Sequence, residues 1–556
     1  MSNKEKNLKQ VLWDLANVMR QTMGAADYMD YVLGIIFYKH LSDKVLDLAA
    51  MTLVDAGEVE ESDVETEAQR QAVYQKYYGD ESFRDDLLDS MNMDYTIKPE
   101  ATFTALMDEI RTQKFQLEHL DQAFTDIEQS NSDLLGHLFD DVELHSTKLG
   151  STPQKRNALI ADVMTALAPL NLDSHSEDIL GDAYEYMIGN FASEMGQKAG
   201  EFYTPQSVSM LLTRIVTSGN EEKKGFSAYD PAMGSGSLLL NIRHYIQDAD
   251  SIEYYGQEIK TSTYNLARMN MIIHGVAATN QHLHNADTLD KDWPADEVTD
   301  FDAVMMNPPY SQKWSADKGF LSDPRFSDYG VLAPKSKADY AFLLHGLYHL
   351  KSTGTMGIVL PHGVLFRGGT EGKIRQKLLE KGYIYAVIGM PAGIFYSTGI
   401  PTIIMVLRKD RPSRDVLFID GSKEFFKGKP QNTMEEENIK RLFDTYQARA
   451  DEDKFAHVAS FDEIKENDYN LNIPRYVDTF EPEPEIDLAE LNKEMAETNA
   501  EIAKNEAELL AMVQDLTTDD EKKAKDLQDF LYLVNYPHLT PSTFEVGACK
   551  SELHRY

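Results

Sequence analysis

The sequence predicts a doubly wound α/β domain that follows a helical N-terminal region. Short apolar runs alternate with helical stretches through the middle of the chain, which is typical of a mainly parallel sheet covered by helices. Two turns rich in glycine or proline, at Asp230 and Asn307, directly follow such apolar runs. Ligands of doubly wound sheets bind at the carboxyl ends of the strands, so both turns fall where a binding site is expected.

Seven apolar runs are the expected strands of this sheet. They lie near Phe226, Ile252, His282, Phe301, Met356, Tyr383 and Thr402. The last run, 401–407, follows its predecessor through a loop and not through a long helix. We therefore expect it to be a reversed strand that forms a hairpin at the edge of the sheet.

Three regions of different composition divide the chain. Residues 1–170 carry apolar side chains at helical spacing and predict an N-terminal helical domain. Residues 171–475 contain the alternating strands and helices. Residues 476–556 begin with a Glu-Pro-Glu-Pro linker and predict a C-terminal helical tail. The chain has 556 residues, too many for one core, which agrees with two or three domains.

The sequence Asn-Pro-Pro-Tyr at 307–310 directly follows the apolar run 301–306. The side-chain oxygen of Asn307 and the carbonyl of Pro308 can both accept hydrogen bonds from one exocyclic amine, and neither proline has an N–H that competes. The ring of Tyr310 offers a surface on which a flat base can stack. The turn therefore fits a planar amine substrate, and the alternative is an ordinary proline turn.

A glycine turn lies upstream, within a strand–turn–helix pattern over 228–240. Gly234 and Gly236 let the backbone approach a ligand closely, because they carry no Cβ atom. The turn is not a G-x-G-x-x-G motif, since position 239 is Leu, and it is not a P-loop, since no Lys-Ser/Thr follows the glycines. A dinucleotide pyrophosphate is therefore not the favoured ligand.

Two acidic residues follow the next expected strands. Glu258 ends the second strand, where a carboxylate suits a ribose diol, and Asp287 follows the third, where it suits an adenine amine. A glycine turn alone is weak evidence. The glycine turn, Glu258, Asp287 and the 307–310 motif in this order indicate an S-adenosylmethionine-dependent methyltransferase.

These motifs resemble the modification (methyltransferase) subunit of type I restriction–modification systems. Such a subunit is an N6-adenine DNA methyltransferase in which the cofactor motifs precede Asn-Pro-Pro-Tyr. The resemblance covers nearly the whole chain and includes the segments 12–43, 200–206 and 357–366. It implies a Rossmann-like methyltransferase sheet in a catalytic domain over 171–475, with S-adenosyl-L-methionine as the cofactor.

The resemblance also implies a set of site residues and no metal. The catalytic residues would be Asn307, Pro308, Pro309 and Tyr310. The cofactor-binding residues would be Glu201, Phe202, Tyr203, Thr204, Pro205, Gln206, Asp230, Gly234, Ser235, Gly236, Ser237, Glu258 and Asp287. The target adenine must leave the duplex to reach such a site. Neither a metal nor a covalent nucleophile is required for this transfer.

Composition predicts a soluble cytoplasmic protein that works with partners. No apolar run is long enough to span a membrane, no apolar segment follows the charged N-terminus, and the single cysteine, Cys549, excludes an intramolecular disulfide. The net charge of −38 opposes unaided binding to DNA phosphates. The resemblance implies a specificity subunit that reads double-stranded DNA, two modification subunits for each specificity subunit, and a separate restriction/translocase subunit. Alternatively, the acidity serves solubility.

The C-terminal tail shows a heptad pattern. Alternating steps of three and four join Leu488, Leu491, Met495, Thr498, Ile502, Asn505, Leu509, Met512 and Leu516. Seven of these nine positions are apolar, which predicts a coiled-coil face. We expect this face to dock on long helices of the specificity subunit, and the alternative is a helix folded back on its own domain. Residues 537–556 lack periodicity.

Basic residues in three places are candidates for contact with DNA. They are Lys148, Lys155 and Arg156 in the helical domain, then Lys313, Lys318, Arg325, Lys335 and Lys337 with Trp314 in the long loop after the motif, and finally Arg408, Lys409, Arg411 and Arg414 after the last strand. A long loop after a catalytic turn is often functional. For each place an ordinary solvated surface is the alternative.

Three other functions stay open on the sequence alone. Asn-Pro-Pro-Tyr turns also occur in enzymes that methylate protein glutamine or guanine in ribosomal RNA, although those chains are generally smaller. A non-catalytic DNA-recognition scaffold would have degraded cofactor motifs, and these are intact. A single-chain modification–restriction enzyme would need a Walker A motif, which the segment 369–373 does not match.

Overall fold

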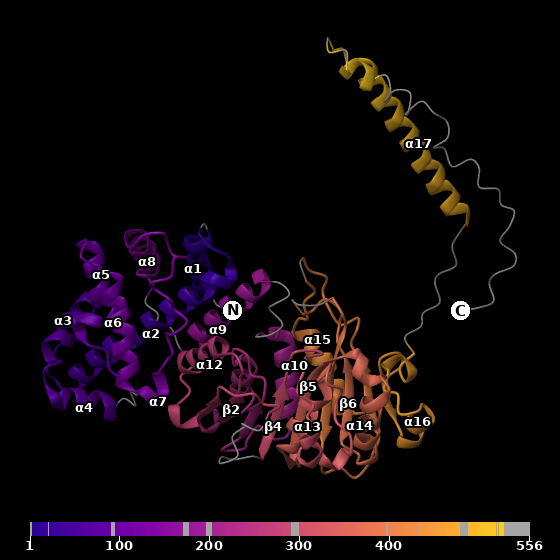
Figure 1. Ribbon diagram of the computed structural model, residues 1–556, viewed down its shortest axis with the longest axis horizontal. Coiled ribbons are helices and arrows are strands. Elements are labelled where there is room, and N and C mark those ends of the chain that lie inside the picture. The colour runs from indigo at the N-terminus through magenta and orange to yellow at the C-terminus, as the bar shows by residue number, and fades with distance from the viewer. Residues whose placement is uncertain are drawn as a thin grey trace. The chain divides into compact units, whose positions relative to one another are not determined.

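The structure is a computed structural model that divides the chain into two compact units, Met1–Thr479 and Phe480–Tyr556 (Figure 1). The boundaries predicted at 170 and 475 stay predictions. The described residues are 3–20, 22–90, 95–170, 177–195, 203–290, 300–395, 399–429, 431–478, 488–518, 520 and 522–527.

The first unit begins with a set of helices packed around one long central helix. They are α1 Asn3–Arg20, α2 Ala25–Asp55, α3 Glu67–Tyr77, α4 Glu81–Ser90, α5 Phe103–Arg111, α6 Leu117–Ser130, α7 Ser132–Leu135, α8 Pro153–Leu167 and α9 Glu177–Met195. Helix α2 is buried along most of its length and on all sides. It even buries Lys39, whose ammonium lies 2.8 Å from the carboxylate of Asp43 one turn on. Such a pair is tolerated inside a core because each charge has its partner.

A nine-stranded sheet follows, in the order β3-β2-β1-β4-β5-β7-β6-β8-β9. Its strands are β1 Ser227–Asp230, β2 Glu253–Gln257, β3 Gln281–His284, β4 Phe301–Met306, β5 Leu350–Pro361, β6 Ile384–Gly389, β7 Thr402–Arg408, β8 Val416–Asp420 and β9 Ala456–Ala459. Neighbouring pairs from β3 to β5 are parallel, as is the pair β6–β8. This sheet, with helical regions before and after it, confirms the predicted doubly wound α/β class.

The predicted position of the reversed strand β7 is wrong in one respect. It is antiparallel, but it lies inside the sheet between β5 and β6 and not at an edge. Two further strands that the sequence analysis did not predict, β8 and β9, extend the sheet beyond β6. Both are short, with 5 and 4 residues.

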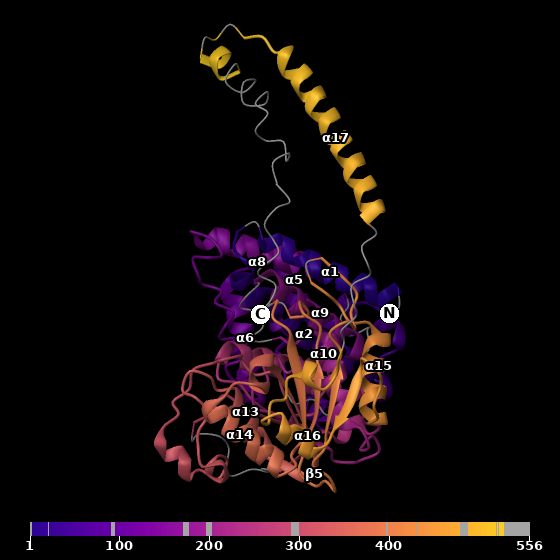
Figure 2. The ribbon, with the colours of Figure 1, turned by 90° about the vertical axis from the view of Figure 1, so that its right-hand side faces the viewer.

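Helices cover both faces of the sheet (Figure 2). Helices α10 Gln206–Thr217, α11 Ser237–Leu240, α12 Thr261–Ile273 and α15 Glu436–Ala448 contribute to one core, and α13 Asp339–Tyr348 and α14 Gly369–Glu380 to the other. Short helix α16 spans Phe461–Glu466. Strand β4 is buried along its whole length because alternate residues enter the two cores: Ala303 belongs to the first and Val304 to the second.

The N-terminal helices contact the sheet region through α12. The amide of Asn265 donates to the carbonyl of His137 at 2.9 Å and to the carboxylate of Asp141 at 3.0 Å. The guanidinium of Arg268 donates to the carbonyls of Leu134 and Gly136 at the end of α7. Because α12 starts just after Glu258, these bonds tie the helical region to the segment that carries the expected ribose contact.

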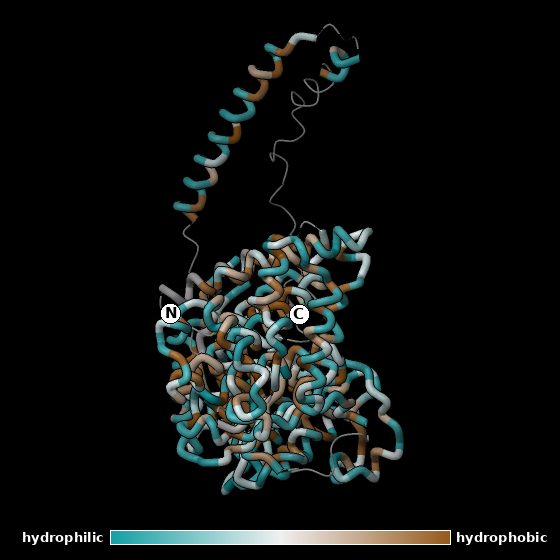
Figure 3. The backbone as a smooth tube through the Cα atoms, turned by 90° about the vertical axis from the view of Figure 1, so that its left-hand side faces the viewer, coloured by the Kyte–Doolittle hydropathy of each residue, from teal (hydrophilic) through white to brown (hydrophobic). Residues whose placement is uncertain are grey.

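The second unit is described mainly as one helix, α17 Leu488–Gln514. None of its described residues is buried, and apolar colours recur along it between polar ones (Figure 3). The predicted coiled-coil pairing stays a prediction, and residues 537–556 lie outside the described part of the chain. Across the described residues, no helix combines the length and apolar character that crossing a bilayer requires.

Candidate active site

The glycine turn leaves the carboxyl end of β1 and leads into α11. Gly234 and Gly236 have φ angles of +56° and +77°, in the left-handed region that favours glycine. The turn starts at Asp230, which is buried, and its carboxylate accepts the N–H of Ala232 at 2.9 Å. Burial raises the pKa of Asp230 to about 8, against a smaller opposing effect of that hydrogen bond. Burial thus favours the neutral carboxyl, and a cationic ligand group beside it would favour the charged carboxylate instead.

The carboxylate of Glu258, directly after β2, is hydrogen-bonded to the glycine turn. One carboxylate oxygen accepts the N–H of Gly234 at 3.2 Å, and the other accepts the N–H of Lys260 at 2.9 Å. Burial raises the pKa of Glu258, while the two backbone hydrogen bonds act in the opposite direction. The carboxylate therefore has a fixed orientation beside the glycine turn.

The Asn-Pro-Pro-Tyr turn follows β4, which lies beside β1 in the sheet. The Asn307 amide nitrogen donates to the hydroxyl of Thr204 at 3.2 Å, and the Tyr310 hydroxyl donates to the Asn307 oxygen at 2.8 Å. Asn307 is thus held from both ends. Thr204 belongs to the segment that precedes α10. The glycine turn, the Asn-Pro-Pro-Tyr turn and this segment therefore lie next to one another.

Two adjacent cavities lie at these strand ends, and Ala232 and Asn307 line both. The larger has a volume of about 310 Å³ and is lined by Pro231, Ala232, Gln257, Glu258, Ile259, Lys260, Ala286, Asp287, Thr288, Asn307, Pro309, Tyr310, Gln312 and Phe342. The smaller is lined by Tyr203, Thr204, Asp230, Ala232, Met233, Gly234, Ser235, Ser237, Leu238 and Asn307. Acceptor-rich and aromatic groups thus face a common space, where a flat, amine-bearing ligand finds both kinds of contact.

Most of the expected site residues therefore come together. Eleven of them line one or both cavities: Tyr203, Thr204, Asp230, Gly234, Ser235, Ser237, Glu258, Asp287, Asn307, Pro309 and Tyr310. Pro205, Gln206, Gly236 and Pro308 line neither, and Gln206 instead donates to Asn241 at 3.0 Å. Glu201 and Phe202 lie outside the described residues.

Several residues that line the larger cavity were absent from the sequence prediction, among them Gln257, Thr288, Gln312 and Phe342. One signal was available, and it covers two of these residues. Gln257 and Thr288 are direct neighbours of Glu258 and Asp287, so the strand ends that gave the acids also gave these residues. Phe342 lies on α13, and no sequence signal distinguishes it from the other apolar residues of that helix.

Comparisons with known proteins show the family to which the chain belongs. The family model for N-6 DNA methylases matches residues 175–485, and the model for the HsdM N-terminal domain matches residues 8–167. The chain belongs to the family of type I restriction–modification methylase subunits. It is accordingly an adenine-specific DNA methyltransferase.

Individual relatives of this methyltransferase cover nearly its full length. It is 34% identical to the methylase subunit of the type I restriction enzyme MpnII from Mycoplasma pneumoniae, over 93% of this chain and 98% of that one. A crystal structure of a type I methyltransferase subunit from Streptococcus thermophilus is 58% identical and has a TM-score of 0.82, covering 86% of this chain and 100% of the other. A modification subunit from Vibrio vulnificus, at 18% identity and a TM-score of 0.55 over 86% of this chain and 97% of that one, shares the fold.

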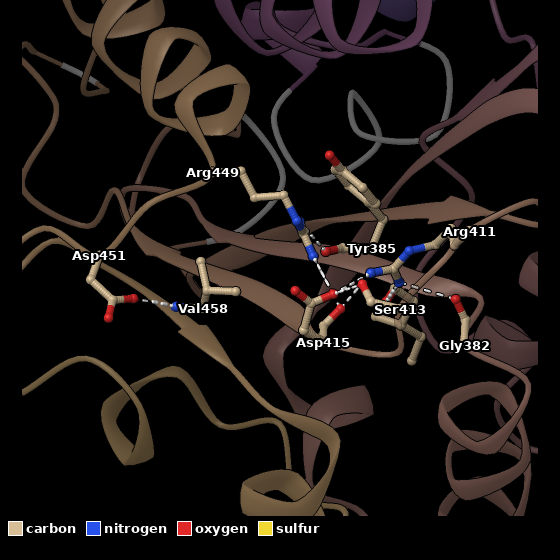
Figure 4. Close-up of polar contacts among 9 residues, drawn as sticks. Gly382, Tyr385, Arg411, Ser413, Asp415, Arg449, Asp451 and Val458 are labelled. Carbon is tan, nitrogen blue, oxygen red and sulfur yellow. Dashed lines mark hydrogen bonds and ion pairs between the residues drawn. The ribbon is translucent and has the colours of Figure 1, made fainter.

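The basic residues after β7 have structural roles in this methyltransferase. Arg411 donates to the carbonyls of Gly382 and Ile384, and Arg411 and Arg449 both bind Asp415 (Figure 4). The guanidiniums of Arg408, Arg411 and Arg449 also lie within 4.0–4.9 Å of the ring centre of Tyr385. These arginines are thus bound to groups of the protein itself. This favours a role in stabilising the fold over contact with DNA phosphate.

The long loop after the motif is also partly a structural element. Trp314, Phe320 and Phe326 are buried against one another, and Arg325 is buried with them. Trp314 and Arg325 are therefore not surface contacts for a displaced strand. Lys313, Lys318 and Lys335 of the same loop are exposed.

Proposed function

We propose that this methyltransferase transfers a methyl group from S-adenosyl-L-methionine to N6 of an adenine flipped out of double-stranded DNA, at sites read by a separate specificity subunit. The observation that carries the proposal is the position of Asn307. Asn307 lines both adjacent cavities, of which one is lined by Glu258 and Asp287 and the other by Gly234 and Asp230. An amine acceptor and a candidate cofactor site thus share one space.

The residues present fit the cofactor. Glu258 would accept hydrogen bonds from the ribose diol, Asp287 from the adenine amine, and the buried Asp230 would face the ammonium group. The glycine turn allows close approach of the backbone. When bound, the cofactor supplies an electrophilic methyl group on a sulfonium. The protein aligns that methyl group with its acceptor, and alignment is a large source of rate in such displacements. As the S–CH3 bond breaks and the N–CH3 bond forms, the amine also loses one proton to give neutral N6-methyladenine.

Asn307 and Tyr310 would hold the target base. The Asn307 oxygen and the Pro308 carbonyl accept both hydrogens of the adenine amine, which turns the nitrogen lone pair toward the methyl group. The Tyr310 hydroxyl donates to the Asn307 oxygen at 2.8 Å. The incoming amine must therefore replace that hydrogen bond as the ring of Tyr310 stacks on the base. Adenine reaches this position only by leaving the duplex.

Partners would supply what this chain lacks. A net charge of −38 is unfavourable for binding DNA phosphates, so a specificity subunit would contribute the cationic surface and the sequence reading. We infer two modification subunits for each specificity subunit, joined through the exposed apolar face of α17. Translocation and cleavage would belong to a separate restriction subunit, because the chain has no Walker A motif.

The test is to identify the methylated product. Purified methyltransferase with its specificity subunit is incubated with S-adenosylmethionine and unmethylated genomic DNA, and the nucleosides are analysed by mass spectrometry after digestion. The proposal predicts N6-methyladenine. Methylation of protein glutamine or of ribosomal RNA in parallel reactions, with no modified adenine in DNA, contradicts it.

A further inference from the structure

Gln257 is the last residue of β2. The oxygen of its side-chain amide has a hydrogen-bond partner, and the nitrogen has none among the described residues. The residue is fully buried and lines the 310 Å³ cavity. Its Oε1 accepts a short hydrogen bond from the hydroxyl of Tyr229. Its Nε2 has no hydrogen-bond partner among the described residues. An unsatisfied buried donor is costly, so its presence beside a cavity indicates that a ligand completes it.

The orientation of this amide is fixed by a chain of hydrogen bonds that begins at Arg325. An arginine only donates, so Nδ1 of His345, 3.2 Å from the guanidinium, must accept. Burial holds the pKa of His345 well below its ordinary value, so the ring is neutral and its proton lies on Nε2. That N–H donates to the Tyr229 hydroxyl at 2.8 Å. The single hydrogen of Tyr229 therefore points to Gln257.

This relay excludes the flipped amide. The Tyr229 hydroxyl donates its hydrogen to Gln257, so the amide atom that faces Tyr229 must be the oxygen. The NH₂ group is therefore the part of the amide that has no partner. Arg325 is itself fixed, because it also donates to the carbonyls of Thr288 and Asp290 at 2.9 and 3.0 Å. The direction of every bond in the chain is thus set by a buried cation, which has no acceptor form.

We propose that Gln257 is a binding residue whose NH₂ group donates to an acceptor atom on the adenosyl half of the cofactor. This inference rests on the proposed function, and it adds a donor to a site whose expected side chains, Glu258 and Asp287, are acceptors. A site with both kinds of group distinguishes adenosine from ligands that offer donors alone.

The position of β2 in the sheet selects the adenosyl half. Gln257 precedes Glu258, and it pairs in register with His284 at the end of β3, three residues before Asp287. Strand β4, with Asn307 after it, lies on the far side of β1. The free donor is therefore on the side of the expected ribose and adenine contacts, away from the strand that carries the target-base motif.

Gln257→Met tests the proposal, because methionine keeps the length of the side chain and removes the donor. Dissociation constants for S-adenosylmethionine, adenosine and methionine are measured by calorimetry on the full-length protein. We expect binding of S-adenosylmethionine and adenosine to weaken about 2- to 10-fold, the usual effect of one neutral hydrogen bond, and binding of methionine to stay unchanged. The matched control is Gln71→Met, since Gln71 is also buried but donates to Pro99 in the N-terminal region.

A second variant covers the case in which Gln257→Met does not fold. Tyr229→Phe leaves Gln257 in place but removes the hydroxyl that orients it, so we expect a weakening of adenosine binding in the same direction and of smaller size. Unchanged adenosine affinity in the folded variants overturns the inference and leaves the proposed function intact. A wild-type protein that binds neither S-adenosylmethionine nor adenosine overturns both.

Discussion

Strand β4 and helix α17 differ in the burial of their apolar side chains. All six residues of β4 are buried, because helices cover both faces of the sheet. None of the described residues of α17 is buried, and Leu491, Ile502 and Leu509 expose 39–48% of their surface. Both segments carry apolar side chains, and those of β4 are covered by helices of the first unit. We propose that the chemistry resides in the first unit and that the apolar face of α17 binds a partner chain.

The largest effect is expected from charging the apolar face of α17. Each buried leucine or isoleucine contributes about 1.5–3 kcal/mol to an interface, so the triple variant Leu491→Glu, Ile502→Glu and Leu509→Glu should abolish co-purification with the specificity subunit. Cofactor affinity should not change. The matched control places glutamates on the opposite face of the helix, as Lys493→Glu, Ala500→Glu and Ala507→Glu, and should assemble normally. Loss of assembly in both triples would refute a specific docking face.

The substitution Asn307→Ala, in the first unit, is expected to cause a comparably large loss of methylation. It removes an acceptor for the adenine amine, and loss of one such oriented group costs about 10²- to 10³-fold in turnover. Cofactor binding and the melting temperature should stay close to those of the wild type. The measurement is the methylation rate in the assembled complex, with Asn280→Ala, outside both cavities, as the control. Turnover at the wild-type rate would remove Asn307 from the site.

Asp230→Asn should change how stability depends on pH. Burial raises the pKa of Asp230 to about 8 in the folded protein, from 3.8 as its ordinary value. Ionisation is therefore disfavoured in the fold, and the free energy of unfolding should fall as pH rises from about 4 to about 8, by an order of a few kcal/mol. The asparagine variant lacks this ionisation. Urea unfolding at pH 5 and pH 8.5 measures both slopes, and equal slopes would contradict the raised pKa.

The smallest effect is expected from Tyr310→Phe. Phenylalanine keeps the stacking ring and removes the hydroxyl that occupies Asn307, so kcat/KM should change by less than about tenfold. Tyr310→Ala removes the ring as well and should lose methylation while it still folds and binds cofactor. The two variants compared in one assay separate stacking from the hydrogen bond. Equal losses in both would assign the main role to the hydroxyl.

The sequence predicted the region with internal packing better than the details of its surface. Seven strands could be placed, because buried strands are nearly continuous apolar runs. Strands β8 and β9 were not predicted, although they are at least as long as the predicted β1 and β3, and β7 was expected at an edge because sequence does not reveal what pairs beyond it. The sequence placed Trp314 and Arg325 in an open loop. Burial of Arg325 depends on the carbonyls of Thr288 and Asp290, which lie far along the chain and are not apparent from the loop's own sequence.

The candidate site divides in the same way. Asn307, Glu258 and Asp287 could be predicted because each follows a recognisable strand. Gln257 follows from the same strand end as Glu258, but its role depends on one unsatisfied nitrogen and on the direction of the hydrogen bonds that link Arg325, His345 and Tyr229, which are far apart in sequence. A turn motif is a local feature of sequence, whereas a hydrogen-bond relay appears only in three dimensions.

The most direct test measures transfer of a tritiated methyl group from S-adenosylmethionine to genomic DNA, with and without the specificity subunit. A chain with a complete catalytic region and an exposed docking helix should incorporate label as N6-methyladenine only when that partner is present. Incorporation at the same rate by this chain alone would contradict the account, because the acidic chain would then bind and modify DNA without the partner that α17 is proposed to hold.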